Sequence, residues 1–515
     1  MLKDLKNFIE AGKFDAYSLQ KFKNQIAKKI NGNAPRRNSD FLAIYREYLE
    51  KKQIEKSPEL ERLLRIRKVR TSSGVSVVSL LMKHFPCPGE CTFCPTEKNM
   101  PKSYLSNEPA VMRAIRVQFS PKRQVDVRLE MLKKTGHPTQ KVEIIVMGGT
   151  FSTIPKKYRT NFIRGILAGL NKKNLSLEKA KQENEKAVHR CVGLTLETRP
   201  DYINEKEIKD FRRLACTRVE VGVQSFSDEI LKKVKRGHSV KKTKEATRLL
   251  KDAGLKIVYH LMPGLPGSSV NKDIGMIREC FENEDFKPDW LKIYPCVVTK
   301  NCELYNEVKK GEFFPLDAEK TAEIIIKAKK YIPPWARLNR VIRDIPSTSI
   351  AFGSKVTNLR QEISKRAKCR CIRCREIREE NFDANELKLK RRDFSSSGGR
   401  EFFLSFEDLE KDKIVSLLRL RFPSQVFTGD NHFISALNGS SIIRELHTFG
   451  VEEDIGHRQE NSQHRGLGKR LILEAEKITR DFGLKKIAVI AGVGVRSYYR
   501  KLGYKLEDEY MVKSF

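Results

Sequence analysis

Between residues 71 and 300, short apolar runs rich in β-branched residues alternate with amphipathic segments long enough to form helices. A continuous apolar run is typical of a strand buried on both faces of a parallel sheet. The runs occupy residues 75–82, 142–149, 192–198, 218–225, 256–264 and 290–298. This α/β pattern predicts a partial (β/α)6 barrel, in which chemistry lies at the carboxyl ends of the strands.

The regions on either side of this pattern differ from it. Residues 1–70 predict basic helices, which either bind RNA or present solvated faces. Residues 401–515 predict a second α/β unit with strands near 414–422, 441–450 and 486–493 and a helix near 466–482. The stretch SSSGGR at 395–400 is typical of a flexible linker. The expected organisation is 1–70, 71–345, a linker at 346–400, and 401–515.

Charge and cysteine content narrow the function. The 515 residues include 101 Lys and Arg against 65 Asp and Glu, a net charge of +36. Such an excess indicates a polyanionic partner, and nucleic acid is the expected one. No apolar run approaches the ~20 residues of a membrane span, and the first residues do not resemble a secretory signal. The 11 cysteines therefore indicate metal sites in a cytoplasmic protein.

Cys87, Cys91 and Cys94 form the motif CxxxCxxC directly after the first predicted strand. Three thiolates can hold three irons of a [4Fe-4S] cluster and leave the fourth iron free to bind S-adenosylmethionine. A zinc site is the alternative, with His84 as the nearest fourth ligand.

A second motif, CxCxxC, contains Cys369, Cys371 and Cys374. Three thiols in six residues indicate structural zinc, with Cys296 as the expected fourth ligand and Cys302 as the alternative. A surface loop with unpaired thiols would show the same spacing.

Polar or glycine residues end the middle strands of the predicted barrel. Gly148 and Gly149 would let the backbone approach S-adenosylmethionine closely. Glu197 and Gln224, at the next two strand ends, would hold its polar groups. Ordinary turns and helix caps remain the alternative for each.

The third unit carries a pattern typical of acyl-CoA binding. Gln463 to Lys469 has the form QxxGxG and opens a helix, where free amides can hold a pyrophosphate. The preceding strand, Arg444 to Thr448, offers backbone groups to a pantetheine arm. After the next strand, Tyr498 or Tyr499 could protonate a leaving thiolate, although one of the pair could simply fill the core.

These motifs together resemble the catalytic subunits of Elongator, the tRNA uridine acetyltransferases. The resemblance is carried by EPAVMRAIR (108–116), KVEIIVMGGTF (141–151), LTLETRPD (194–201), VEVGVQS (219–225), MPGLPG (262–267), WLKIYP (290–295), RDIPS (343–347) and GVRSYYRKLGY (494–504). It implies a radical-S-adenosylmethionine barrel followed by a GNAT-type acetyltransferase domain. The implied reaction places an acetyl-derived carbon on C5 of the wobble uridine, and thioester hydrolysis leads towards 5-carboxymethyluridine.

The resemblance also implies site residues and partners. The residues that match acetyl-CoA contacts are Lys141, Glu445, Leu446, His447, Thr448, Gly466, Leu467, Gly468, Lys469 and Tyr499. The implied partners are the tRNA anticodon stem-loop, an electron donor, and either a second copy of the chain or other Elongator-like subunits.

Two other functions remain open at this level. One is a protein lysine acetyltransferase in which the cluster only supports structure, since the acetyltransferase fold permits either acceptor. The other is a tRNA-binding assembly protein without turnover.

Overall fold

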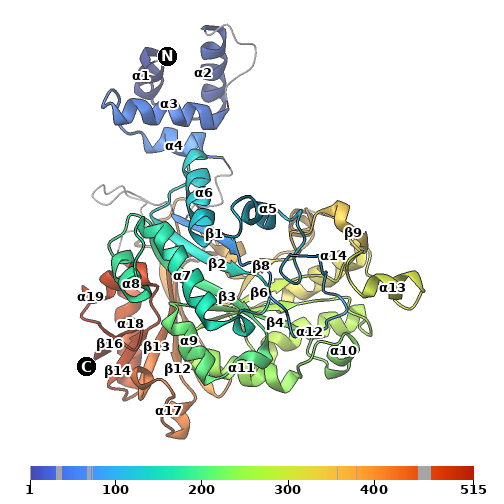
Figure 1. Cartoon of the computed structure of the whole chain (residues 1–515). Helices are drawn as coiled ribbons and strands as arrows, with labels where there is room; N and C mark the ends of the chain where they lie inside the picture. The colour runs from blue at the N-terminus through green and yellow to red at the C-terminus, as the bar shows by residue number, and fades with distance from the viewer. Residues whose placement is uncertain are drawn as a thin grey trace.

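The computed structural model describes residues 2–29, 37–66, 71, 73–356, 358–378, 380–450 and 466–515. Figure 1 shows a helical N-terminal unit at the end of α6, a central barrel, and a C-terminal sheet packed against the barrel. Within the described residues, no helix is both long and apolar enough to cross a membrane.

The N-terminal unit has its own small core. Leu42, Tyr45 and Leu60 are fully buried, and the rings of Phe8 and Phe22 stack with centroids 4.5 Å apart. Its helices are α1 (Leu2–Glu10), α2 (Ala16–Lys29), α3 (Asn38–Glu50) and α4 (Pro58–Leu64). The expected helical N-terminus is confirmed for the part of it that the structure describes.

The central unit is a sheet of seven parallel strands in the order β1-β2-β3-β4-β5-β6-β8. The strands are β1 (Val75–Leu81), β2 (Lys141–Met147), β3 (Arg190–Thr198), β4 (Arg218–Gln224), β5 (Lys256–Leu261), β6 (Trp290–Ile293) and β8 (Arg337–Arg340). The six predicted strands are confirmed, and the short β8 is added to them.

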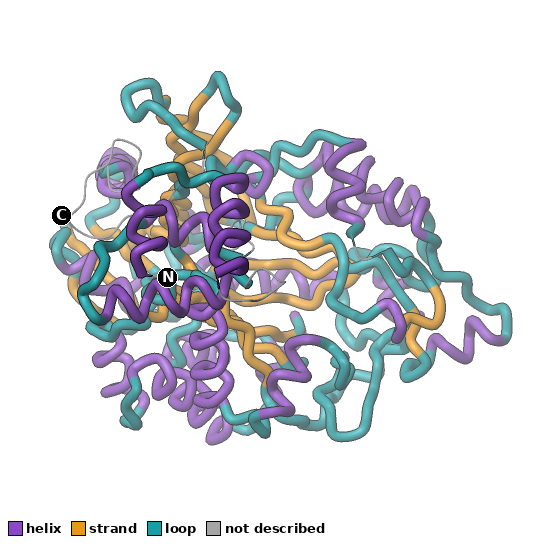
Figure 2. Tube along the Cα trace, turned by 90° about the horizontal axis from the view of Figure 1, so that it is seen from above, coloured by secondary structure: helices purple, strands orange, loops and turns teal. Residues whose placement is uncertain are grey.

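Helices cover the outer face of this sheet, as Figure 2 shows from above. They are α5 (Pro109–Arg116), α6 (Pro121–Lys134), α7 (Lys156–Asn171), α8 (Leu177–Asn184), α9 (Glu205–Arg213), α10 (Asp228–Lys233), α11 (Val240–Asp252), α12 (Val270–Glu282) and α14 (Ala318–Ala328). Helix α13 (Leu304–Lys309) lies away from the sheet, beside residues 298–299 (Figure 1). Side-chain caps start several of them: Asn204 accepts from the Glu207 amide at 3.0 Å, and Asp317 accepts from the Lys320 amide at 2.8 Å.

Alternation along the strands separates an apolar outer face from a polar lumen. On β2, Val142, Ile144 and Val146 are fully buried beneath the helices, whereas the intervening residues are partly exposed. Since successive side chains point to opposite faces of a strand, the intervening residues line the lumen.

A small ribbon and two short helices lead to the third unit. They are β7 (Val298–Thr299), which pairs with β9 (Ile350–Phe352), followed by α15 (Leu359–Arg366) and α16 (Ile372–Arg375).

The C-terminal sheet has the order β10-β11-β12-β13-β14-β16-β15, and its pairs are antiparallel except β13 with β14. Its strands are β10 (Lys388–Ser396), β11 (Gly399–Asp408), β12 (Lys413–Phe422), β13 (Ser440–Thr448), β14 (Lys486–Val489), β15 (Lys505–Glu507) and β16 (Tyr510–Ser514). Its helices are α17 (Gln425–Thr428), α18 (Leu467–Asp481) and α19 (Arg496–Arg500).

The structure corrects the expected linker at 395–400. These residues join β10 to β11 in a tight hairpin, with Ser396 paired to Gly399. Ser397 and Gly398 both have positive φ, 49° and 74°, which is the geometry of a two-residue type I′ turn. The third unit therefore begins at Lys388, before the expected boundary at 401.

Buried charges fix the C-terminal sheet to the amino end of the barrel. Arg421 and Asp252 are both fully buried and lie 2.6 Å apart. Arg444 contacts Asp289 at 2.6 Å and Glu401 at 3.0 Å. Because each charge comes from a distant segment, these pairs set the position of β11, β12 and β13 relative to the barrel.

We predict that Arg421→Ala destabilises the protein by about 3–5 kcal/mol, because it leaves the Asp252 carboxylate buried without its partner. Chemical unfolding of the metal-free chain measures the effect. The control is Arg391→Ala, which removes an exposed pair with Asp393 and should cost less than about 1 kcal/mol. Equal effects of the two variants would contradict this role of Arg421.

Candidate active site: the cysteine loop, the barrel lumen and the interdomain cavity

The cysteine loop follows β1 at the carboxyl end of the barrel. The Thr92 amide donates to the Val234 carbonyl at 3.2 Å, and the Cys94 amide donates to the Cys91 carbonyl at 3.0 Å. Cys91 and Phe93 pack in a buried apolar cluster. The loop is thereby held against the segment after α10.

The three thiols of this loop have different surroundings. Cys87 Sγ lies 3.9 Å from the hydroxyl of Thr150, and Cys91 Sγ accepts a hydrogen bond of 3.3 Å from Arg236. Burial and then the charge of Cys91 raise the pKa of Cys94 to about 11, so metal binding would have to displace its proton.

The strand-end residues that the sequence singled out gather around this loop. Gly148 and Gly149 have φ of 136° and 93°, and a Cβ on Gly148 would lie 3.2 Å from Met82. Gln224 has φ of 71°, a strained conformation for a residue with a side chain, and its buried Oε1 has no partner among the described residues. The backbone at Gly148 and Gly149 and the amide oxygen of Gln224 therefore leave polar groups available at the carboxyl end of the barrel.

Glu197 ends β3 inside the lumen, where it accepts a hydrogen bond of 2.7 Å from the hydroxyl of Tyr104. Burial and then the charge of Glu220 raise the pKa of Glu197 above its usual value. Glu220 on β4 in turn lies 2.7 Å from Nε2 of His260 and contacts the ammonium group of Lys292.

Glu197, Glu220 and His260 bring potential ligand atoms within 4.8 Å of one another, but a cation already occupies this group. Burial alone would lower the pKa of Lys292, but the charges of Glu220, Tyr294 and Glu197 together outweigh burial and raise that pKa. Glu220, His260 and Lys292 were not identified from the sequence. Each is a charged or imidazole residue within an otherwise apolar strand, and this pattern could have identified them.

A cavity of about 1710 Å³ lies at the opposite, amino end of the barrel. Lys141, Arg218 and Lys256 line it from the first residues of their strands. From the C-terminal unit it is lined by Glu445, Leu446, His447, Thr448, Gly466, Gly468, Lys469, Tyr498 and Tyr499. The structure thus brings together nearly all the residues expected to contact acetyl-CoA; Leu467 is buried behind them.

The C-terminal sheet splays open at this cavity. β14 pairs with β13 from Ser440 to Ile443 and ends at Val489, whereas β13 continues to Thr448. A register shift on β12 between Arg419 and Leu420 accompanies the divergence. The gap exposes the edge of β13 to an extended ligand.

Helix α18 begins at the mouth of this gap. Gly466 precedes it with φ of 75°, and a Cβ on Gly468 would lie 3.6 Å from the Tyr498 hydroxyl and 3.9 Å from Thr448 Oγ1. Amides at such a helix start attract anions. Gln463, His464 and Arg465 of the predicted motif lie outside the described residues.

The two neighbouring tyrosines occupy different environments. Tyr499 is 6% exposed and packs on Tyr504, whereas Tyr498 is 40% exposed and reaches Gly468. Burial raises the pKa of both phenols, so both stay protonated at neutral pH. Tyr498 therefore has the better access to the cavity.

The second cysteine motif lies at the amino end of the barrel. The sulfur atoms of Cys369, Cys371 and Cys374 are within 4.8 Å of one another. Zn–S bonds of about 2.3 Å in a tetrahedron place sulfurs about 3.8 Å apart, so this group fits a single ion. Hydrogen bonds from Cys369 and then Cys374 lower the pKa of the Cys371 thiol.

The structure corrects the expected fourth ligand. Cys296 and Cys302 pack in the apolar cluster that contains Cys91, at the carboxyl end of the barrel. The second motif instead adjoins the start of β8, where the Ile372 amide donates to the Ala336 carbonyl at 2.9 Å. The barrel separates the two positions.

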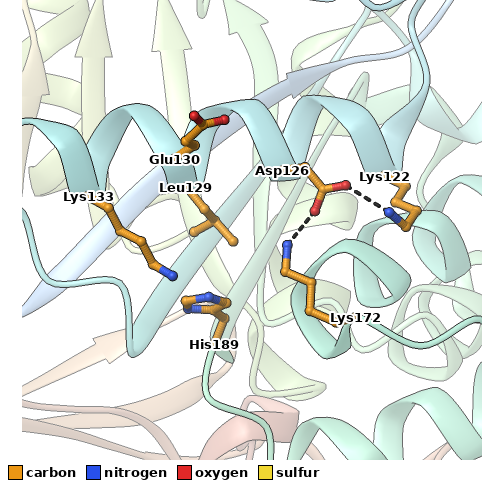
Figure 3. Close-up of a pocket in the computed structure, with 7 residues that line it drawn as sticks. All are labelled: Lys122, Asp126, Leu129, Glu130, Lys133, Lys172 and His189. Atoms are coloured by element: carbon orange, nitrogen blue, oxygen red, sulfur yellow. Dashed lines mark hydrogen bonds and ion pairs between the residues drawn. The ribbon is translucent and has the colours of Figure 1, made fainter. Parts of the chain in front are cut away.

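A smaller recess outside α6 contains charges that satisfy one another. Figure 3 shows Lys122 and Lys172 both directed at Asp126. His189 beside them hydrogen-bonds the Thr139 carbonyl at 2.8 Å.

Comparison with protein families matches the central barrel and the segment that follows it. Residues 86–279 match the radical SAM superfamily, and residues 288–368 match the radical SAM C-terminal domain. The first match spans Cys87, Cys91 and Cys94, and the second ends just before Cys369.

The chain is also similar to full-length relatives. It is 44% identical to the tRNA uridine(34) acetyltransferase of Methanocaldococcus infernus, over 99% of this chain and 97% of that protein. It is 38% identical to human Elongator complex protein 3, over 96% and 93% of the two chains. The solved structure of the archaeal Methanocaldococcus infernus Elp3 with an N-terminal deletion matches with a TM-score of 0.74 at 43% identity, over 86% of this chain and all of that one.

Sequence, fold and site geometry agree: the chain belongs to the radical SAM family of tRNA uridine(34) acetyltransferases that includes Elongator complex protein 3.

Proposed function

We propose that this protein modifies C5 of the wobble uridine in a tRNA anticodon, using S-adenosylmethionine and acetyl-CoA, towards 5-carboxymethyluridine. The observation that carries the proposal is the position of the two candidate sites. The cysteine loop and the acyl cavity lie at opposite ends of one barrel whose lumen is polar. A thioester arm that enters from the cavity is thereby directed towards the radical source.

Membership of the radical SAM superfamily implies a [4Fe-4S] cluster and S-adenosylmethionine. The loop fits the cluster: Cys87, Cys91 and Cys94 are free cysteines, and among the described residues they do not form the tight group that suits a single ion. When bound, the cluster supplies one-electron cleavage of S-adenosylmethionine and hence radical chemistry. Gly148, Gly149, Glu197 and Gln224 would position S-adenosylmethionine beside it.

The acyl cavity fits acetyl-CoA. The open edge of β13 would pair with the pantetheine amides, and the start of α18 at Gly468 and Lys469 would hold the pyrophosphate. Lys141 faces the same cavity from the barrel. Tyr498, with Tyr499 behind it, would protonate the thiolate released on hydrolysis.

The net charge of +36 supports tRNA as the acceptor. Basic residues of the N-terminal unit, Arg46, Arg62 and Arg65, line the cavity together with the acetyltransferase residues. A polyanion bound to these helices would therefore lie at the acyl site. This arrangement favours RNA over a protein lysine acceptor.

Zinc at Cys369, Cys371 and Cys374 is a separate proposal. The tight sulfur group is the supporting observation, and its place between β8 and the C-terminal unit would brace the junction.

The central test is an anaerobic assay of the reconstituted protein with purified tRNA, reductant, S-adenosylmethionine and acetyl-CoA. Nucleoside mass analysis should show a carboxymethyl mass on uridine. Cys91→Ala should abolish 5′-deoxyadenosine formation because the cluster is lost, and it should change tRNA affinity less than about threefold. Stimulation of acetyl-CoA turnover by histone-like peptides and not by tRNA would refute the proposal.

The tyrosines are separated by single substitutions. Tyr498→Phe should slow tRNA-dependent acetyl-CoA hydrolysis at least about tenfold, since general acids typically contribute that much or more. Tyr499→Phe should have the smaller effect on turnover because its ring packs in the core. Steady-state kinetics decides, and unchanged turnover in both variants would exclude a proton role for the pair.

Elemental analysis tests the zinc proposal. Cys371→Ser should remove one equivalent of zinc and lower thermal stability while leaving the iron content of reconstituted protein intact. Cys216→Ser, at a buried cysteine outside both motifs, is the control and should retain zinc. Loss of iron instead of zinc from Cys371→Ser would show that these cysteines hold an iron–sulfur centre.

A further inference from the structure

Two arginines are buried against the cysteine loop, although neither belongs to it. Arg199 follows β3 and Arg236 follows α10, and each is 6% exposed. Placing a guanidinium in such a position is costly unless an anion compensates it.

Arg199 has such an anion nearby. Its Nε and Nη2 donate to the two carboxylate oxygens of Asp201 at 3.0 and 2.9 Å. Its Nη2 also donates to the Arg236 carbonyl at 2.7 Å. The charge of Arg199 is thus balanced by a carboxylate, and its side chain fixes the backbone at Arg236.

Arg236 differs, because no ion pair found among the described residues includes it. Its Nη2 donates to the Gly222 carbonyl at 2.5 Å, and its Nη1 donates to Cys91 Sγ at 3.3 Å. A Cβ at position 222 would lie 2.7 Å from Nη2. The glycine therefore gives the guanidinium access to the sulfur, and a thiolate of the cysteine loop would supply the compensating anion.

We propose that Arg236 is a positioning residue that sets the reduction potential of the cluster through its hydrogen bond to Cys91. The proposal rests on the assignment of Cys91 as a cluster ligand. Reduction adds one negative charge to the cluster, and a fixed buried cation at a ligand sulfur stabilises that added charge. Hydrogen bonds to sulfur and solvent exposure are general determinants of such potentials. Arg236 would therefore make the cluster easier to reduce.

The test uses the full-length, anaerobically reconstituted protein and two substitutions at this site. Arg236→Gln removes the charge, and Arg236→Lys keeps the charge but loses the planar pair of donors. Lys235→Gln is the matched control: it removes the same charge from the adjacent residue, whose side chain is 52% exposed and pairs with Glu303. Iron and sulfide content are measured first, followed by the midpoint potential from a redox titration monitored by electron paramagnetic resonance.

Arg236→Gln should retain the cluster. At a fixed potential, the ratio of oxidised to reduced cluster should rise about tenfold, which corresponds to a midpoint potential about 59 mV lower for a one-electron couple. Arg236→Lys should shift it less, and Lys235→Gln should leave it unchanged. A potential in Arg236→Gln equal to that of the control would overturn the proposal.

Loss of the cluster from both Arg236 variants, with retention in Lys235→Gln, would also overturn it, because Arg236 would then be structural. These outcomes are distinguishable from failure of the proposed function. A wild-type protein that binds no cluster rejects the ligand assignment itself, whereas a wild-type protein with a cluster but no uridine product rejects only the reaction.

Discussion

The arrangement of both candidate sites depends on one set of buried ion pairs between the barrel and the C-terminal sheet. Arg421 with Asp252, and Arg444 with Asp289, place β12 and β13 against the amino ends of the barrel strands, and Glu401 on β11 pairs with both arginines within the sheet. Paired buried charges do not necessarily add stability over apolar packing, but breaking one pair leaves an uncompensated charge. Such a network therefore favours one relative position of the two units.

That position gives the barrel a candidate site at each end. In a parallel barrel the carboxyl end carries the chemistry, and here the cysteine loop occupies it. The amino end, which usually serves stability, instead borders the interdomain cavity through Lys141, Arg218 and Lys256. The lumen between them contains Glu220, Lys292 and other paired polar groups, so a polar substrate arm would meet hydrogen-bonding groups along its path.

The two cysteine motifs illustrate how geometry separates chemistries that look alike in sequence. The tight sulfur group of Cys369, Cys371 and Cys374 suits one ion. Cys87, Cys91 and Cys94 are spread over a longer loop, and a basic side chain donates to one of them. The hydrogen bond from the buried Arg236 to Cys91 therefore distinguishes the first cysteine motif from the tight sulfur group of the second.

The sequence by itself determined the local features: the six buried strands, the helical N-terminal unit, the cysteine loop and the start of α18. Each follows from periodicity, glycine placement or ligand spacing within one short segment. Tertiary structure decided what depends on pairing between distant segments. It made 395–400 a hairpin turn, placed Cys296 beside Cys91, and gave Tyr498 better access than Tyr499 to the cavity. The physical reason is that strand registers and buried ion pairs, which join residues far apart in the chain, fix which side chains face one another across the barrel.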